Sequence, residues 1–288
     1  MEFFTSYDGT KLAYHLAGDG PSVVCLPGGP MRAAAYLGDL GGLSAQHQLI
    51  TLDLRGTGQS AQPEDPGTFR CDRLVDDVEA LREHLGLDRM NLLGHSAGAS
   101  LAALYTSRHP ERVSRLALIT PSVMAVGLTI SGDDRLDTAR SRRGKPWFPA
   151  AFAALEAIVA GKATPDSWRA IAPFHYGRWD EAARAHRADG DKQKNTEAAT
   201  AFTADGAFDP GATRAALAQF ASPVLLIAGD ADPAAPPRAV AEFAELFPHA
   251  ELVVQPRAGH FPWLDDADRF VTTSTAFLGG DHVPDPSL

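Results

Sequence analysis

Ser96 lies at the centre of the stretch that most strongly indicates chemistry, Gly94 to Gly98 (Gly-His-Ser-Ala-Gly). This stretch matches the pattern G-x-S-x-G and separates an apolar run, Met90 to Leu93, from residues Ala99 to Ser107. The apolar run predicts a short buried strand, and the residues after the serine predict a helix. Glycines on both sides allow a tight strand-to-helix turn, which presents the serine hydroxyl to a substrate. Ser96 is therefore the candidate nucleophile.

A serine hydroxyl is a weak nucleophile at neutral pH, so Ser96 needs a base, and that base needs an orienting acid. Two later residues follow predicted strands: Asp232 lies after the run from Val224 to Ala228, and His260 lies after the last predicted strand. We expect His260 to accept the Ser96 proton and an ionised Asp232 to fix the imidazole. Asp230 is the alternative acid, but it adjoins the strand end, where it can cap the loop instead.

Negative charge that develops on a carbonyl oxygen needs backbone N–H donors nearby. Ala97 follows the nucleophile at the start of the predicted helix, where unpaired N–H groups and the helix dipole favour an anion. A second source is the loop Pro27-Gly28-Gly29-Pro30, which follows a predicted strand. We expect Ala97 and Gly29 to form an oxyanion hole, with Gly28 as the alternative donor in the loop. His95, inside the turn, is expected to support it.

These residues need a sheet to hold them, and short apolar runs alternate with helical patterns along most of the chain. The pattern opens with a hairpin turn at Asp8-Gly9 and predicts a mostly parallel, twisted sheet with helices on both faces. The alternation stops between residues 122 and 220, where we find no convincing strand. We expect a core of residues 1–121 and 221–288 and an inserted helical cap of residues 122–220 over the ligand crevice. The predicted strands are 3–5, 11–15, 23–26, 49–53, 90–93, 116–119, 224–228 and 252–254.

Aromatic side chains are the candidates for the substrate pocket, because three of the four tryptophans lie in the predicted cap. The alternative is that most of them form the small core of the insertion itself. The candidates for substrate binding are Trp147, Phe148, Trp168, Phe174, Tyr176, Trp179 and Trp263.

The composition of the chain limits the kinds of binding partner and the cellular location that we expect. The formal charge of −10, without a dense Lys/Arg cluster, excludes nucleic acid and an anionic membrane surface as expected partners. No apolar run is long enough to cross a bilayer, and the first residues lack a secretory pattern. Cys25 and Cys71 form no CxxC pair, and the histidines show no ligand spacing, so we expect free thiols, a cytoplasmic protein, no metal and no cofactor. The tail from Gly279 is expected to be loosely ordered, and the oligomeric state stays open.

Taken together, the chain resembles the α/β-hydrolases, and among them the proline iminopeptidase branch. The resemblance covers nearly the whole chain outside the cap. It implies the α/β-hydrolase fold with an inserted cap, a triad in the order Ser96, Asp232, His260, and hydrolysis of a small molecule or short peptide through an acyl-enzyme. The loop around Arg55 is implied to be structural. The motifs that carry the resemblance are Gly28-Gly29-Pro30, Asp53 to Ser60, Gly94 to Gly98, Gly229 to Asp232 and Gly259 to Trp263.

Two departures from the branch affect the expected substrate. Pro27 stands where these proteins usually have histidine, and Pro173 stands at the acid position of a Glu-x-His-Tyr context that helps to bind the α-amine of the substrate. Glu197, Asp205 or another acid of the cap can replace that anchor. Without such a replacement, we expect a carboxylesterase or lactonase activity on a neutral molecule as much as an aminopeptidase activity. A cofactor-free lyase or a ligand-binding protein on the same fold is the alternative from another class.

Overall fold

A single eight-stranded sheet forms the centre of the molecule. Its strands are β1 (Glu2–Thr5), β2 (Lys11–Ala17), β3 (Ser22–Leu26), β4 (Gln48–Leu52), β5 (Met90–His95), β6 (Val113–Ile119), β7 (Val224–Gly229) and β8 (Ala250–Gln255). They lie in the order β1-β2-β4-β3-β5-β6-β7-β8. β2 pairs antiparallel with β1 and β4, and the later pairs are parallel. This arrangement confirms the predicted hairpin and the mostly parallel sheet.

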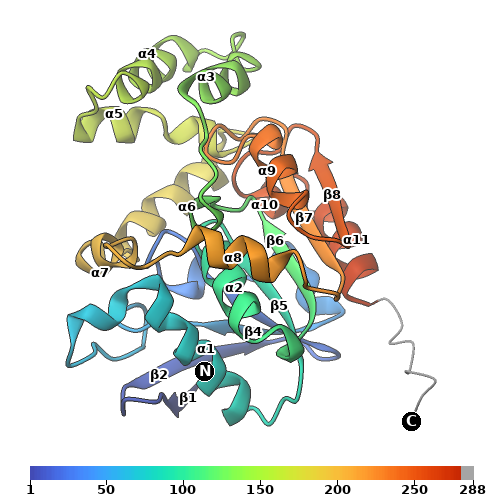
Figure 1. Cartoon of the computed structure of the whole chain (residues 1–288). Helices are drawn as coiled ribbons and strands as arrows, with labels where there is room; N and C mark the ends of the chain where they lie inside the picture. Colours follow the sequence, from blue (N-terminus) through green and yellow to red (C-terminus); the bar gives the residue numbers. More distant parts are fainter. Residues whose placement is uncertain (280–288) are drawn as a thin grey trace.

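The computed structural model describes residues 1–279, so the predicted loose tail lies outside the described residues from residue 280 onward. Helices surround the sheet (Figure 1). The α-helices are α1 (Cys71–His84), α2 (Ala97–Arg108), α3 (Gly132–Arg140), α4 (Phe148–Val159), α5 (Pro165–Ala170), α6 (Glu181–Lys192), α7 (Thr196–Phe202), α8 (Pro210–Leu217), α9 (Pro237–Ala244), α10 (Pro262–Asp265) and α11 (Ala267–Leu278). The 3₁₀ helices are η1 (Ala34–Leu37), η2 (Leu43–Ala45), η3 (Pro66–Phe69), η4 (Pro110–Arg112), η5 (Met124–Val126) and η6 (Ala172–His175).

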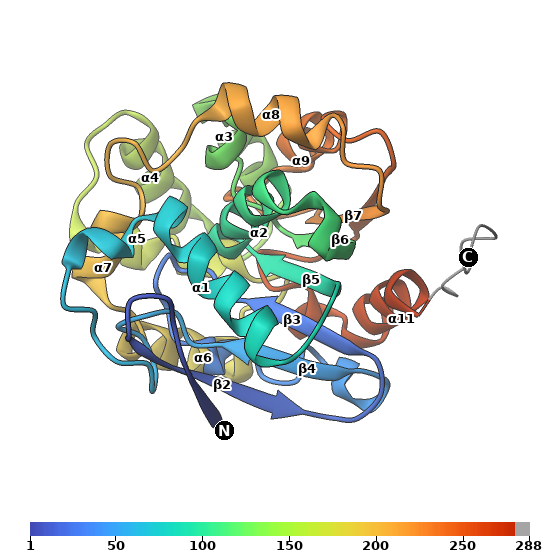
Figure 2. The same cartoon turned by 60° about the horizontal axis from the view of Figure 1, so that its bottom comes forward.

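The central strands bury both of their faces. In β3, Val24 and Leu26 pack into the core that includes α1, α2, α8 and α9, whereas Val23 and Cys25 pack on the opposite face with η1, η2 and α11. Successive side chains of a strand point to opposite faces, so a strand covered on both sides reads as a continuous apolar run. Figure 2 shows α1 and α2 on one side of the sheet and α11 on the other.

The loop after β4 is held by a buried ion pair. The guanidinium of Arg55 is fully buried and donates from Nε to Asp77 Oδ2 of α1 at 2.8 Å, and from Nη1 to Asp8 Oδ2 at 2.7 Å. A buried charge of this kind is tolerated only with such partners. The pairing ties the N-terminal hairpin, the loop and α1 together, in keeping with the structural role expected for this loop.

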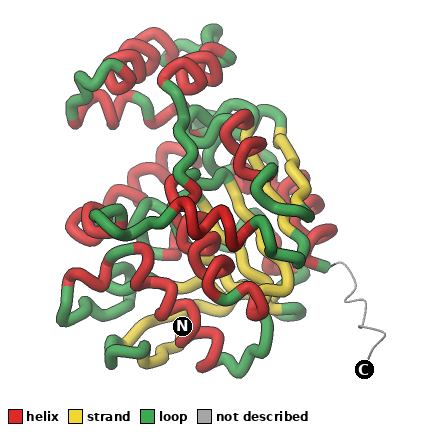
Figure 3. Tube along the Cα trace, in the orientation of Figure 1, coloured by secondary structure: helices red, strands yellow, loops and turns green. Residues whose placement is uncertain are grey.

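The chain between β6 and β7 carries α3 to α8 and contains no strand. Figure 1 shows α3, α4 and α5 as a group set apart from the sheet, and the tube in Figure 3 shows a loop that connects this group to the core. α8 packs differently, because Leu217 lies in the same core as α2. The last helix of the predicted insertion therefore covers the sheet, and the limits of the cap at residues 122–220 stay a prediction.

Both cysteines are buried free thiols. Burial raises the pKa of Cys25 to about 12 and raises that of Cys71 well above its usual range, so neither thiol is a reactive thiolate near neutral pH. Within residues 1–279, no helix combines the length and the apolar character that a membrane span requires.

Candidate active site

Ser96 lies on the turn between β5 and α2 with a backbone φ of 54°. Positive φ is rare for a residue with a side chain and marks a strained turn. The neighbouring glycines are needed because the turn is tight: a Cβ on Gly94 would lie 2.6 Å from the carbonyl oxygen of Gly98, and a Cβ on Gly98 would overlap the carbonyl oxygen of Leu26. The sequence pattern therefore forms the predicted strand-to-helix turn.

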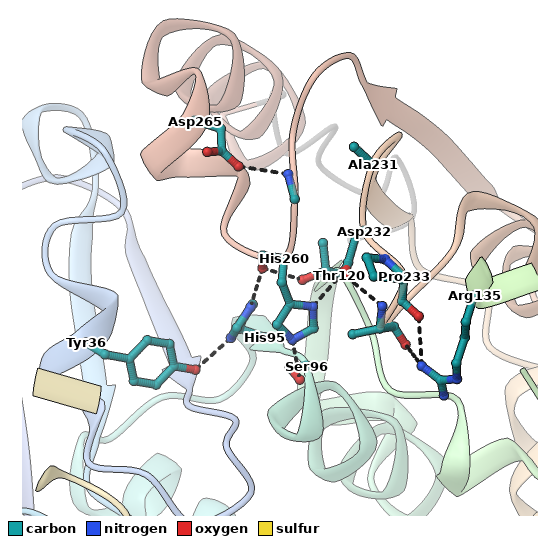
Figure 4. A network of polar contacts seen from close by, with 12 residues as sticks. Tyr36, His95, Ser96, Thr120, Arg135, Ala231, Asp232, Pro233, His260 and Asp265 are labelled. Carbon is teal, nitrogen blue, oxygen red and sulfur yellow. Dashed lines mark hydrogen bonds and ion pairs between the residues drawn. The ribbon is translucent and has the colours of Figure 1, made fainter. Parts of the chain in front are cut away.

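His260 joins Ser96 to a buried carboxylate. Its Nε2 lies 2.8 Å from Ser96 Oγ, and its Nδ1 lies 2.7 Å from Asp232 Oδ2 (Figure 4). Because a carboxylate accepts at Nδ1, the proton of the neutral ring sits on Nδ1 and Nε2 is free to accept the serine proton. Asp230 is exposed and forms no hydrogen bond or ion pair with His260, so the structure brings together the three residues preferred from the sequence.

The charge of Asp232 is stabilised although its side chain is fully buried. Burial by itself raises the pKa of this carboxyl, but the nearby imidazole of His260 and a hydrogen bond from the Ala234 N–H, at 2.9 Å, outweigh it. The pKa of Asp232 is consequently lowered from its ordinary value. An ionised carboxylate at this position orients the imidazole and favours an imidazolium when one forms.

The backbone of His260 is fixed on both sides. Its N–H donates to the carbonyl of His175 at 2.7 Å, and its carbonyl accepts hydrogen bonds from Thr120 Oγ1 and His95 Nε2, each at 2.9 Å. The preceding Gly259 N–H donates to Asp265 Oδ2 at 2.8 Å. These contacts come from β5, the residue after β6, η6 and α10, so several elements hold the imidazole beside Ser96 (Figure 4).

A second set of hydrogen bonds links the Gly-Gly loop to the histidine loop through Tyr36 of η1. The Gly28 N–H donates to Tyr36 Oη at 2.6 Å, and Tyr36 Oη donates to His95 Nδ1 at 2.7 Å. His95 is buried, and burial followed by the nearby His260 lowers its pKa well below the ordinary value, so its ring stays neutral. His95 thus supports the turn, as expected, whereas the role of Tyr36 was missed because nothing in the sequence marks it.

The oxyanion donors expected from the sequence differ in their availability. Gly28 is already bonded to Tyr36, while the N–H groups of Gly29 and Ala97 have no acceptor within residues 1–279. A Cβ on Gly28 would lie 2.9 Å from Ser96 Cβ, which shows how closely the loop approaches the serine. The free donors near Ser96 Oγ are therefore Gly29 and Ala97, the pair preferred from the sequence.

A small polar cavity of about 220 Å³ opens at Ser96 and His260. Gly29 and Tyr36 line it, and the chain between β6 and β7 adds His175 and other polar residues. Its charged lining consists of three cations and one carboxylate, Arg32, Arg187, Lys194 and Asp191. We did not predict this cationic lining, since its members come from the loop after β3 and from the distant α6 region.

A larger cavity of about 620 Å³ also reaches Ser96 and His260, and its walls are mostly apolar. Figure 4 places Tyr36, from the polar cavity, and Arg135, from the apolar one, on opposite sides of the Ser96–His260 pair. Arg135 donates to the carbonyl of Pro233 at 2.7 Å and so turns its charge toward the backbone. Apolar contacts in this cavity include Val123, Met124, Leu128, Ile130, Trp168 and Phe202.

The aromatic candidates for substrate binding separate into two groups. Tyr176 lines the polar cavity, Trp168 lines the apolar cavity, and Phe174 lines an adjoining cavity with Trp168. The structure brings none of the remaining four to these cavities. They make packing contacts instead: Trp147 with Phe174, Phe148 with Phe152, Trp179 with Tyr176, and the almost fully buried Trp263 with His95.

Within residues 1–279, no three His, Cys, Asp or Glu side chains gather in a way that could hold a metal ion. The groups that the structure brings together at this site are a serine hydroxyl, an imidazole, a carboxylate and two backbone N–H groups without an acceptor.

The chain belongs to the α/β-hydrolase fold family, whose model matches residues 21–267. Within that family it resembles proline iminopeptidases. It is 35% identical over 108 residues to the proline iminopeptidase of Heyndrickxia coagulans, a match that covers 38% of this chain and 38% of the relative. A cis-3-alkyl-4-alkyloxetan-2-one decarboxylase from Shewanella oneidensis is 26% identical, with 96% of this chain and 87% of the relative covered.

Solved structures show the same fold. The proline iminopeptidase of Mycobacterium smegmatis superimposes with a TM-score of 0.73 at 24% identity, covering 96% of this chain and 98% of that one. Esterases and an enzyme that degrades N-acyl homoserine lactones are also similar in structure. At this level of identity the likeness establishes the fold and leaves the substrate open.

Proposed function

We propose that this protein is a serine hydrolase that cleaves a small ester, lactone or amide through an acyl-enzyme on Ser96. The observation that carries the proposal is the continuous line Ser96 Oγ, His260, Asp232, with separations of 2.8 and 2.7 Å. His260 removes the serine proton as Oγ attacks the carbonyl carbon, and Gly29 and Ala97 donate N–H groups to the oxyanion. The imidazolium then protonates the leaving group, which departs and leaves the acyl group on Ser96.

Deacylation uses the same groups in the second half of the cycle. Water takes the place of the leaving group, and His260 accepts its proton as the oxygen attacks the acyl carbon. The second tetrahedral intermediate again places its negative charge on the oxygen near Gly29 and Ala97. Its collapse returns the proton to Ser96 and releases the acid. Asp232 stays ionised throughout and stabilises the imidazolium at both stages.

Esters and lactones suit the cavities better than an N-terminal peptide does. An aminopeptidase needs a free carboxylate to bind the α-ammonium group of its substrate. Glu197 and Asp205 line neither cavity at Ser96, and Asp191, which does, already pairs with Arg187 at 3.2 Å. We therefore place the carboxylesterase or lactonase activity first and the proline iminopeptidase-like activity, favoured by the Heyndrickxia relative, second.

Covalent labelling tests the nucleophile. A fluorophosphonate probe should label the protein at one site, and Ser96→Ala should abolish the labelling. Ser107→Ala is the matched control, since this serine lies on the same helix and only donates to the Leu104 carbonyl. Labelling that persists in Ser96→Ala, or that is absent from the wild-type protein, would contradict the proposal.

Substrate comparison tests the class. We expect a short-chain 4-nitrophenyl ester to be hydrolysed with a higher kcat/KM than L-prolyl-4-nitroanilide, and the opposite order would move the aminopeptidase to first place. The Shewanella relative, named a decarboxylase of a cis-oxetanone, gives the lyase alternative its specific support. A cis-3,4-dialkyl-oxetan-2-one separates the two reactions, because hydrolysis yields a hydroxy acid whereas decarboxylation yields an alkene and carbon dioxide.

A further inference from the structure

The polar cavity beside Ser96 carries cations although the chain as a whole is acidic, with a formal charge of −10. Arg32 is the deepest of them, since its residue is 9% exposed, whereas Lys194 is exposed and Arg187 is 36% exposed in its side chain. Solvent screens the two outer charges more strongly than it screens Arg32. The buried guanidinium therefore dominates the field inside this cavity.

Arg32 lacks the partner that a buried cation normally has. Its Nε donates to Gln193 Oε1 at 3.2 Å, and its Nη2 donates to the His186 carbonyl at 3.4 Å. No carboxylate of residues 1–279 forms an ion pair with it; Asp191, the one acid in the lining, pairs with Arg187. A buried charge without an opposite charge is costly, and a bound anion would remove that cost.

The surroundings of Arg32 are shaped to admit its guanidinium. The guanidinium lies over the ring of Tyr36, with its Cζ atom 4.1 Å from the centroid of that ring. A Cβ on Gly190 of α6 would lie 2.5 Å from Cζ and 2.6 Å from Nη2, so a larger residue there would require the guanidinium to move. Glycine inside a helix costs roughly 1 kcal/mol relative to alanine. Glycine at this position of α6 therefore allows the guanidinium to lie against the helix backbone where it is observed.

The same chain segments bring Lys194 next to Arg32. An isolated antiparallel bridge pairs these two residues, with the Ala33 N–H donating to the Gln193 carbonyl at 3.0 Å and the Asn195 N–H donating to the Met31 carbonyl at 3.0 Å. The loop that carries Gly29 therefore also carries Arg32, and the cap supplies the second cation. The cationic wall and the oxyanion loop are parts of one structure.

We propose that this cavity binds a carboxylate of the substrate, so that the enzyme acts on an ester, lactone or amide that carries a free acid close to the scissile carbonyl. The inference rests on the proposed hydrolase function and specifies its substrate class. A planar guanidinium and a carboxylate match in shape and charge. Arg32 is the most deeply buried cation of the lining, and one guanidinium balances a carboxylate of charge −1 more closely than a phosphate monoester, whose charge is about −2.

Kinetics on matched substrates tests the inference. We compare 4-nitrophenyl hydrogen adipate with its neutral methyl ester, which places the acid on the acyl side, and 4-acetoxybenzoate with methyl 4-acetoxybenzoate, which places it on the leaving group. In one of the pairs the acid should have at least a tenfold higher kcat/KM. Arg32→Gln should reduce this acid-to-neutral ratio at least tenfold, and Lys194→Gln should reduce it less.

A ratio is the informative readout, because a merely structural role of Arg32 would slow both members of a pair equally. Lys162→Gln, which removes one exposed positive charge that lines neither cavity, is the matched control and should leave the ratio unchanged. Equal rates for acid and neutral ester in both pairs would overturn the inference. So would a preference for the acid that survives in both Arg32→Gln and Lys194→Gln.

Calorimetry measures ligand binding and does not require catalysis. It therefore tests the carboxylate site independently of the proposed hydrolase activity. Monomethyl adipate, dimethyl adipate and inorganic phosphate are titrated into Ser96→Ala. The mono-acid should bind at least tenfold more tightly than the other two, and adding Arg32→Gln should abolish the difference. Tighter binding of phosphate, or equal binding of the two adipates, would overturn the carboxylate class. Failure of the proposed function has a different signature, absent fluorophosphonate labelling of Ser96 in the wild-type protein.

Discussion

The two cavities that meet at Ser96 and His260 differ in origin as well as in polarity. The polar cavity is closed by the loop after β3 and the region of α6, and it presents Arg32 and Lys194. The apolar cavity is closed by the segment after β6, around η5, together with Trp168 of α5. One nucleophile thus faces two environments, which suits a substrate with a charged end and an apolar end. In the proposed function both cavities share the same chemistry, and we expect each cavity to select one end of the substrate.

The largest effect is expected at the residues that both cavities share. His260→Ala should lower kcat about 10⁴-fold or more for charged and neutral esters alike, because the base is lost whichever cavity binds the substrate. Steady-state kinetics on the adipate pair measures this. His249→Ala, at an exposed histidine after α9, is the control. A loss confined to one member of the pair would break the view that the chemistry is common.

Tyr36→Phe tests the contribution of the polar cavity, because Tyr36 lines this cavity and bonds to the loop that carries the proposed oxyanion donor. The change removes the hydroxyl that accepts from the Gly28 N–H and donates to His95 Nδ1, and leaves a buried N–H without a partner. We expect a loss of about 1–3 kcal/mol in the free energy of unfolding, measured in urea. We also expect kcat to fall roughly tenfold, because about 1.4 kcal/mol of lost transition-state stabilisation corresponds to that factor. An unchanged kcat in the folded variant would show that the Tyr36 link does not position the oxyanion loop.

Trp168→Ala probes the apolar side. This tryptophan is 54% exposed and lines the apolar cavity, so its removal should raise KM for a 4-nitrophenyl hexanoate about fivefold and change KM for the acetate little. Kinetics along a series of acyl chain lengths provides the measurement. Trp147→Ala, which lines none of the cavities, should change neither value once the folded fraction is taken into account. Equal effects on acetate and hexanoate would place the acyl chain elsewhere.

The smallest effect is a pH dependence of stability at His175, which lines the polar cavity and the one adjoining the apolar cavity. Burial, followed by the nearby His260, lowers the pKa of His175 from 6.5 to about 4. The unfolded chain therefore binds more protons between pH 6.5 and 4, and stability falls as the pH falls through that window.

Urea unfolding at pH 7 and pH 5 tests this linkage. We expect His175→Gln to lose less free energy of unfolding between the two pH values than the wild-type protein loses. His249→Gln, at an exposed position, should lose as much as the wild type. The linkage would be refuted by equal losses in all three proteins.

Sequence patterns predicted where the strands lie more accurately than they predicted the residues at which the strands begin and end. β5 continues to His95, two residues past the predicted end, because a parallel partner extends the ladder from Gly94 and His95 to Leu118 and Ile119. β6 begins at Val113, three residues before its predicted start. Ser114 and Arg115 interrupt the apolar run, but the strand continues through a register shift, with Val113 paired to Met90 and Arg115 paired to Asn91. Pairing between strands sets these ends, and a local pattern does not contain it.

By itself the sequence predicted the order Ser96, Asp232, His260 for the proposed nucleophile, acid and base, and it determined the turns that carry them. Glycines at 94 and 98 permit the tight turn at Ser96, and parallel strands bring their carboxyl ends to one edge wherever the intervening chain goes. The aromatic candidates cannot be assigned by such reasoning, because an aromatic side chain fits the packed core of an insertion as well as the lining of a substrate pocket. Only packing decides between the two.

The tertiary structure alone decided the charge of the polar cavity. Arg32 and Lys194 are far apart in the chain and meet through one antiparallel bridge, and Gly190 leaves the space that the guanidinium fills. The physical reason is that the chemistry of this site depends on short segments with recognisable residues, whereas its electrostatics depend on which distant segments come into contact.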